Sequence, residues 1–216
     1  MKLTLLVTSI LATAASLNGA TITFATQPTT NSPIAPVVDS ASGLLVDGAG
    51  FVAIGATTLS DLQVGQIGAS PANFSTFVTS FSQFGLSTTF GGAGAFGEPS
   101  LFSSIASNPT ATGDSFVNRA ITLVAGNGTR LDNSTQLFVY NFNVNYAADA
   151  PLFTADVNLT QAGGTVLFGA TQIGIALPTA GTNNGFKMGE LSVIPEPSAA
   201  LLGVLGALGL LRRRRI

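Results

Sequence analysis

The stretch Phe138-Val139-Tyr140-Asn141-Phe142-Asn143-Val144-Asn145-Tyr146 gives the clearest indication of the fold class. Large apolar side chains occupy every second position, and three asparagines stand between them. Because successive side chains of a strand point to opposite faces of a sheet, this alternation predicts a β-strand with one buried face. We therefore expect a mainly β protein.

The same alternation recurs on both sides of this stretch, most clearly in residues 153–160. Further strands are predicted near residues 22–25, 44–54, 120–125, 165–168, 173–177 and 186–194. Gly126-Asn127-Gly128 and Gly163-Gly164 have the composition of turns between strands. Short alternating strands separated by turns predict an antiparallel β-sandwich or a jelly-roll-like body.

One segment has the period of a helix instead. Its apolar residues recur at intervals of three and four, namely Phe74, Phe77, Val78, Phe81 and Phe84. Ser70-Pro71 precedes the segment and Gly85 follows it, which is the typical punctuation of a helix start and end. We expect one or two short helices in the body, and we expect the aromatic face of this one to close an open end of the sandwich or barrel.

Composition limits the chemistry available to the body. Charged residues make up only 8% of the 216 residues, and residues 21–193 contain three basic against nine acidic side chains. An acidic surface repels phosphate backbones, so nucleic acid is excluded as a partner. The chain has no cysteine and no histidine, so disulfides, thiolate metal sites and Ser-His-Asp catalysis are excluded. We expect no metal and no cofactor.

The N-terminus predicts an export signal. Met1-Lys2 is followed by an apolar run over residues 3–15 and by small residues up to Ala20. Residues 1–20 are therefore assigned to a signal peptide with a signal helix, and the mature domain begins at Thr21. Asn18 suits the −3 position of that cut poorly, so cleavage after Ala14 or Ser16 stays open, as does an uncleaved anchor.

The C-terminus predicts a membrane segment. Val193-Ile194-Pro195-Glu196-Pro197 is followed by an uncharged run over residues 198–211 and by four arginines, Arg212, Arg213, Arg214 and Arg215. The prolines favour an extended spacer, after which a transmembrane helix can begin. Cationic clusters stay on the cytoplasmic side, so the body, residues 21–193, is expected outside.

These last residues resemble the PEP-CTERM sorting signal of Gram-negative bacteria: Pro195, Glu196 and Pro197 match the motif, and the apolar helix and the arginines follow in the same order. The resemblance covers only residues 194–216. It implies recognition and cleavage of the tail by an exosortase, a membrane-embedded protease-transpeptidase, and a link to exopolysaccharide or biofilm. The predicted course is a precursor tethered to the inner membrane, then a cell-surface or extracellular-matrix protein. A tail anchor that is never cut is the alternative.

Asn141, Asn143 and Asn145 are candidate ligand contacts in the body. In a straight strand their side chains would project from one face about 6.5–7 Å apart. Such a row could hydrogen-bond sugar hydroxyls, or with Asp149 could contribute oxygen ligands to Ca²⁺. A carbohydrate-binding module is therefore an alternative function, although a polar outer face is also normal in antiparallel sheets.

Evidence for an enzyme is weaker. Gly92-Ala93-Gly94-Ala95-Phe96-Gly97 matches G-x-G-x-x-G, but Glu98-Pro99 follows at once and no strand–helix unit surrounds it, so a loop is predicted. A secreted hydrolase would need two converging carboxylates, for which the candidates are Asp114, Asp132, Asp149 and Asp156. No nucleophile or base is distinguished by its sequence context. We therefore expect a non-enzymatic body.

Overall fold

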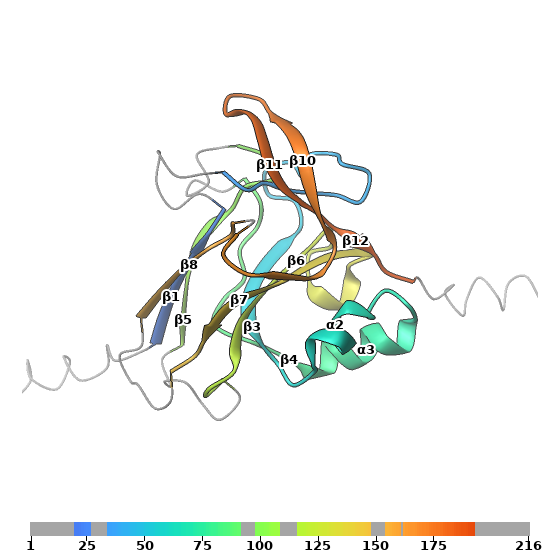
Figure 1. Ribbon diagram of the computed structural model, residues 1–216, viewed down its shortest axis with the longest axis vertical. Coiled ribbons are helices and arrows are strands. Elements are labelled where there is room, and N and C mark those ends of the chain that lie inside the picture. Colours follow the sequence, from blue (N-terminus) through green and yellow to red (C-terminus); the bar gives the residue numbers. More distant parts are fainter. Residues whose placement is uncertain are drawn as a thin grey trace, which may run out of the picture.

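The computed structural model describes residues 20–26, 34–91, 98–108, 116–147, 154–160 and 162–192. They form a mainly β fold with two helices, which confirms the fold class predicted from the sequence. Two sheets pack face to face, a third sheet lies beside them, and the helices cover the outside of the larger sheet (Figure 1).

The larger sheet, called the central sheet below, is antiparallel throughout. Its strands, in spatial order, are β12 (Gly189–Glu190), β7 (Gln136–Asn145), β6 (Ala120–Gly126), β3 (Phe51–Thr57) and β4 (Phe81–Gln83). A further strand, β9 (Thr165–Phe168), also pairs with β7. The stretch that predicted the fold class therefore forms the longest strand of this sheet.

Each of the two smaller sheets contains a parallel pair. The outer sheet has the order β5 (Ser103–Asn108), β1 (Ala20–Ala25) and β8 (Thr154–Asn158), with β1 parallel to β8. The arm consists of β10 (Ala170–Leu177), β11 (Gly181–Lys187) and β2 (Val37–Val38), with β11 parallel to β2. The body predicted to be antiparallel therefore also contains two parallel pairs. Each joins strands far apart in the sequence, where no hairpin imposes an antiparallel direction.

The main core lies between the central and outer sheets. Phe138, Tyr140 and Phe142 of β7 belong to it, together with Ile22 and Phe24 of β1, and all five are buried. The ring centroids of Tyr140 and Phe142 lie 5.1 Å apart in an edge-on arrangement, and those of Phe138 and Tyr140 lie 6.0 Å apart. The alternation along β7 thus places its aromatic residues against the outer sheet, as the sequence predicts.

The opposite face of the central sheet is buried as well, under α2 (Asp61–Gly65) and α3 (Pro71–Ser80). Phe77 of α3 is fully buried in a second core with Phe51, Val124 and Val139 of the sheet. The expectation that the helix closes an open end of the sandwich is therefore wrong, because α3 lies over a face. Burial on both sides explains why β3 and β6 are apolar almost without alternation.

The helix starts as predicted but ends earlier. The Ser70 side chain caps α3 by accepting a hydrogen bond from the backbone N–H of Asn73 at 3.2 Å, and Pro71 occupies the first turn. The helix ends at Ser80, and the next residue, Phe81, pairs with Thr57 in β4. Phe84, which fits the helical spacing, instead belongs to the main core on the other side of the sheet.

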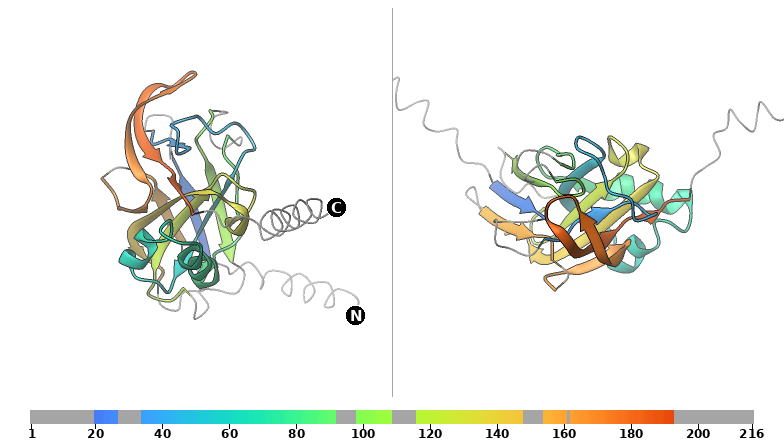
Figure 2. Two further views of the ribbon diagram at one scale, coloured as in Figure 1. Left: turned by 90° about the vertical axis from the view of Figure 1, so that its right-hand side faces the viewer. Right: turned by 90° about the horizontal axis from the view of Figure 1, so that it is seen from above.

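The described chain begins and ends on opposite sides of the domain. Figures 1 and 2 show the start of β1 on one side and the end of β12 on the other, close to α2 and α3. The hairpin of β10 and β11 extends beyond the rest of the fold in both figures. A short 3₁₀ helix, η3 (Leu131–Asn133), lies in the connection between β6 and β7 and contacts α3.

Candidate functional site

The predicted sorting residues Pro195, Glu196 and Pro197 and the arginines 212–215 lie outside the described residues, as does the predicted signal peptide up to residue 19. Of the helices in the described part, none has both the length and the apolar character needed to cross a bilayer. The structure therefore describes the body that the two end signals would flank.

The described chain leaves the fold beside the helices. Glu190 pairs with Gln136 of β7, and the backbone N–H of Leu191 donates to the carbonyl of Thr135 at 2.9 Å. Leu191 is buried in the core beneath the helices, and the Ser192 hydroxyl donates to the Gly68 carbonyl at 2.7 Å. The last described residues are thus fixed to the domain by both packing and hydrogen bonds.

A groove of about 530 Å³ lies at this exit, between α3 and the segment around η3. Its lining combines apolar side chains with small polar ones: Pro71, Phe74, Ser75, Val78, Asp132, Asn133, Ser134, Thr135, Leu191 and Ser192. A smaller cavity of about 230 Å³ shares Val78 and Asp132 with it. The volume of the larger groove, about 530 Å³, lies within the range of protein pockets that bind small molecules.

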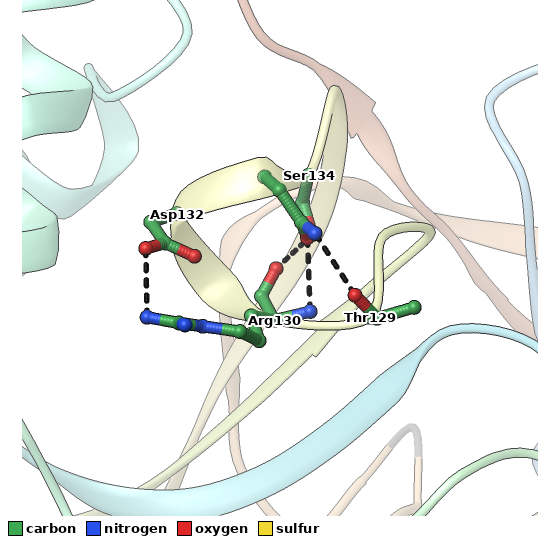
Figure 3. A network of polar contacts seen from close by, with 5 residues as sticks. Thr129, Arg130, Asp132 and Ser134 are labelled. Atoms are coloured by element: carbon green, nitrogen blue, oxygen red, sulfur yellow. Dashed lines mark hydrogen bonds and ion pairs between the residues drawn. The ribbon is translucent and has the colours of Figure 1, made fainter.

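The wall of the groove opposite α3 is held by a local network of polar contacts (Figure 3). The Ser134 hydroxyl donates to the Arg130 carbonyl at 2.8 Å, and the Asn133 side-chain oxygen accepts from the Arg130 backbone N–H at 2.9 Å. The Arg130 guanidinium pairs with the Asp132 carboxylate at 2.9 Å. Both partners are largely exposed, so the ion pair contributes at most about 1 kcal/mol. The network therefore fixes the wall mainly through the two hydrogen bonds to the Arg130 backbone.

The predicted row of asparagines is interrupted. Between the pairs Ala120–Asn145 and Thr122–Asn141, β7 advances four residues while β6 advances two, so β7 bulges there. Asn143 has a φ of 56°, in the left-handed region that asparagine tolerates better than most residues. The three side chains therefore do not form the evenly spaced row of a straight strand.

Local contacts engage two of these asparagines. The Asn141 side-chain oxygen accepts a hydrogen bond from the backbone N–H of Asn143 at 2.8 Å, which stabilises the bulge. The Asn143 amide approaches the Thr165 hydroxyl of β9 at 3.4 Å. Asp149, the proposed additional Ca²⁺ ligand, lies outside the described residues. Within the described ranges, no three acidic side chains gather closely enough to hold a metal ion.

A second cavity, more polar, lies beside the arm. It measures about 370 Å³ and is lined by Ile34, Ala35, Leu159, Thr160, Thr182, Asn183 and Asn184. The Asn183 amide nitrogen donates to the carbonyls of Ala180 at 3.0 Å and Gly181 at 3.2 Å, and the Asn184 side-chain oxygen accepts from the Gly174 N–H at 3.3 Å. These bonds orient two carboxamides around the cavity. Neither residue lies in an alternating stretch, so the sequence pattern gave no indication of either.

A tyrosine of the main core is hydrogen-bonded to one of the residues that line this cavity. The Tyr140 hydroxyl donates to the Thr160 carbonyl at 2.6 Å, and Thr160 lines the polar cavity. Burial raises the pKa of the Tyr140 phenol, because the ionised form would lose its hydration. Tyr140 therefore remains neutral at physiological pH and serves as a fixed hydrogen-bond donor.

Of the four carboxylates considered for hydrolysis, the two that the structure describes do not form a pair. Asp114 and Asp149 lie outside the described residues. Asp132 lines the groove and pairs with Arg130, whereas Asp156 is exposed on β8 of the outer sheet. Asp132 and Asp156 thus belong to different parts of the fold, one at the helices and one on the opposite sheet.

One buried acid was not singled out in the sequence. The Glu98 side chain is 5% exposed, and one of its oxygens accepts from the Thr179 backbone N–H at 3.1 Å. Its other oxygen has no hydrogen-bond partner among the described residues. The glycine-rich run that matches G-x-G-x-x-G, residues 92–97, immediately precedes it and lies outside the described residues.

Comparison with known proteins adds no further constraint. A scan against protein-family models, a search of curated proteins and a search of solved structures each gave no match.

Proposed function

We propose that this chain is an exported, surface-sorted envelope or extracellular-matrix protein without enzymatic activity. Its C-terminal tail, from residue 194, is recognised through Pro195, Glu196 and Pro197 and cleaved by an exosortase. The apolar helix inserts into the membrane, and Arg212–Arg215 keep the end of the chain in the cytoplasm. After cleavage the body is retained at the cell surface or released into exopolysaccharide.

The observation that supports this proposal most is the point along the chain at which the packed body ends. Leu191 is the last buried residue of the described chain, and its backbone completes the pairing beside β7. Among the described residues, all members of the three cores precede the proposed recognition motif. Removal of the tail would leave the packing among these residues intact, as expected of a sorting signal that is cut off.

The other end of the body favours the two open cleavage positions, after Ala14 and after Ser16, over a cut after Ala20. Ala20, the last residue assigned to the signal peptide, is fully buried in β1 and pairs with Asn108 of β5. Cleavage after Ala14 or Ser16 would keep this pair, whereas cleavage after Ala20 would remove it. We therefore expect the mature chain to start before Ala20.

Mass spectrometry of the mature protein from its native host tests the proposal, because it measures both ends of the chain. We expect an N-terminus near residue 15 or 17 and a C-terminus close to the Pro195–Pro197 motif. Glu196→Gln should block tail removal, whereas Asp156→Asn, the same chemical change on the exposed face of β8, should leave it unchanged. Recovery of the full-length chain from the cytosol would contradict the proposal.

A second candidate function, carbohydrate binding, is favoured by the polar cavity beside the arm. Its carboxamides and hydroxyls are neutral donors and acceptors, which suit sugar hydroxyls. Binding to the host exopolysaccharide should weaken in Asn183→Ala if this cavity is the site, and in Asn141→Ala or Asn143→Ala if the bulge of β7 is. Unchanged binding in all three variants would reject both locations.

A further inference from the structure

The groove between α3 and η3 ends at the point where the sorting tail begins. Leu191 and Ser192 form part of its lining, and Ser192 is held there by its bond to the Gly68 carbonyl. An extended chain advances about 3.3–3.6 Å per residue. The two residues that follow Ser192 therefore lie within reach of the groove without any rearrangement of the body.

The chemistry of these two residues matches the lining. Phe74 and Val78 stand one turn apart on α3, and both are half-buried, so each presents apolar surface to the groove. Val193 and Ile194 are the next side chains along the chain, and both are apolar. Ile194 precedes a proline, which favours the extended conformation needed to run along a groove.

We propose that Val193 and Ile194 occupy this groove and hold the Pro195-Glu196-Pro197 motif directly against the α3–η3 face of the body. The binding of these two residues in the groove, called the seating below, is inferred from the groove and the adjacent sequence. Its consequence for processing rests on the proposed sorting function: the protease meets the motif beside this face rather than on a free linker.

Disulfide trapping tests the seating directly, because the chain has no cysteine of its own. In the full-length chain purified in detergent, Val78→Cys combined with Ile194→Cys should form an intramolecular disulfide on oxidation with diamide. Thr154→Cys combined with Ile194→Cys provides the matched control, because Thr154 is exposed on the outer sheet. The control pair should stay reduced within the monomer.

Two results would overturn the seating. Equal trapping of the two pairs would mean that the tail has no preferred position. Disulfides between chains from the Val78 pair would mean that the groove binds a second copy instead. Maleimide labelling of each single cysteine verifies that every thiol is reactive.

A substitution that leaves the tail unlabelled gives an independent measurement. Val78→Asp places a carboxylate in the apolar part of the groove and should increase limited proteolysis at Val193–Ile194 several-fold, because a buried unpaired charge is unfavourable. Thr76→Asp, on an exposed position of the same helix, should leave this rate unchanged. Equal cleavage rates in both variants, with the body still folded by circular dichroism, would contradict the seating.

The two proposals can fail separately. If the Val78–Ile194 disulfide forms but the host leaves the tail uncut, the groove binds Val193 and Ile194 and the sorting function is wrong. If the host removes the tail and the disulfide does not form, the sorting function stands and the seating is wrong.

Discussion

The central sheet and the arm show how the same kind of strand differs when it is covered on two faces or on one. In the middle of the central sheet, β3, β6 and β7 are buried between the outer sheet and the helices. In the arm, β10 contributes Ile175 and Leu177 to a small third core, while Ile173 is 77% exposed. The arm also protrudes from the rest of the domain (Figure 1).

This difference has a physical cause that is visible in the side chains. A strand covered on both faces buries apolar residues at odd and even positions, so its stability comes from two cores at once. A strand covered on one face has only half of its side chains to bury. We therefore expect substitutions in the central sheet to be costly and those on the outer face of the arm to be nearly neutral.

The largest effect is expected at Phe138, which is fully buried. Its ring centroid lies 4.9 Å from the ring centroid of Phe186 and 6.0 Å from that of Tyr140. Phe138→Ala removes these contacts and leaves a cavity, so the free energy of unfolding should fall by about 3–5 kcal/mol. Chemical denaturation followed by circular dichroism measures this. A loss below about 1 kcal/mol would mean that the two-sheet core is not packed as described.

A smaller effect is expected where β9 joins the central sheet. A side-chain carbon at Gly164 would collide with the Asn141 carbonyl oxygen and approach the Tyr140 ring at 2.7 Å. Gly164→Ala should therefore lower the free energy of unfolding by about 1–3 kcal/mol through overpacking. The control is Gly65→Ala in α2, where the nearest atom, the Leu167 carbonyl oxygen, would be at 3.4 Å. The control should be neutral or stabilising, because alanine favours helix.

Much of this architecture follows from residues whose local preference and tertiary surroundings agree. The strands at residues 22–25, 120–125 and 165–168 and the start of α3 at Ser70-Pro71 were predicted from the sequence and are confirmed. By contrast, β5 has the sequence Ser-Ser-Ile-Ala-Ser-Asn, which is mostly polar, and only its pairing with β1 makes it a strand. The strand conformation of this segment depends on its pairing with β1, so no local sequence pattern could have predicted it.

Two details of the helices add to the sequence prediction of one or two short helices, for different reasons. The capping pair of α2, Ser60 and Gln63, is a recognisable helix-start signal that marks the position of the second helix. The early end of α3 was not predictable from spacing, because Phe81 packs in the helix-side core from a strand and Phe84 packs in the main core. For the candidate sites, the alternation around Asn141 located the right strand, but the bulge at Asn143 depends on its pairing with β6.

A third prediction concerns how the free energy of unfolding depends on pH through the tyrosines of the main core. Burial raises the pKa of both tyrosines of the chain, Tyr140 and Tyr146. Above pH 10 the unfolded chain releases phenol protons that the folded chain keeps, so the contribution of these two groups to the free energy of unfolding should be constant below pH 10 and fall above it. Absorbance at 295 nm should show tyrosine ionisation only as the domain unfolds. Ionisation of either phenol near pH 10 in the folded protein would contradict its burial.

A single substitution separates the hydrogen bond of Tyr140 from its packing. Tyr140→Phe removes the 2.6 Å bond to the Thr160 carbonyl and keeps the ring, so the free energy of unfolding should fall by about 0.5–1.5 kcal/mol. The decline above pH 10 should also become shallower, because one of the two titrating groups is gone. An unchanged slope would assign the pH dependence to other groups.

The smallest effect is expected on the exposed face of the arm. Ile173→Lys replaces a side chain that is 77% exposed on β10, so the free energy of unfolding of the isolated protein should change by less than about 0.5 kcal/mol. Ile175→Ala, two residues along the same strand, is the contrast, because Ile175 is 6% exposed within the third core and should lose about 2–5 kcal/mol. Equal losses in the two variants would mean that the outer face of β10 is covered in solution, and the arm would then resemble the central sheet. Measuring both variants at several protein concentrations shows whether another copy of the chain covers this face, because such cover weakens on dilution.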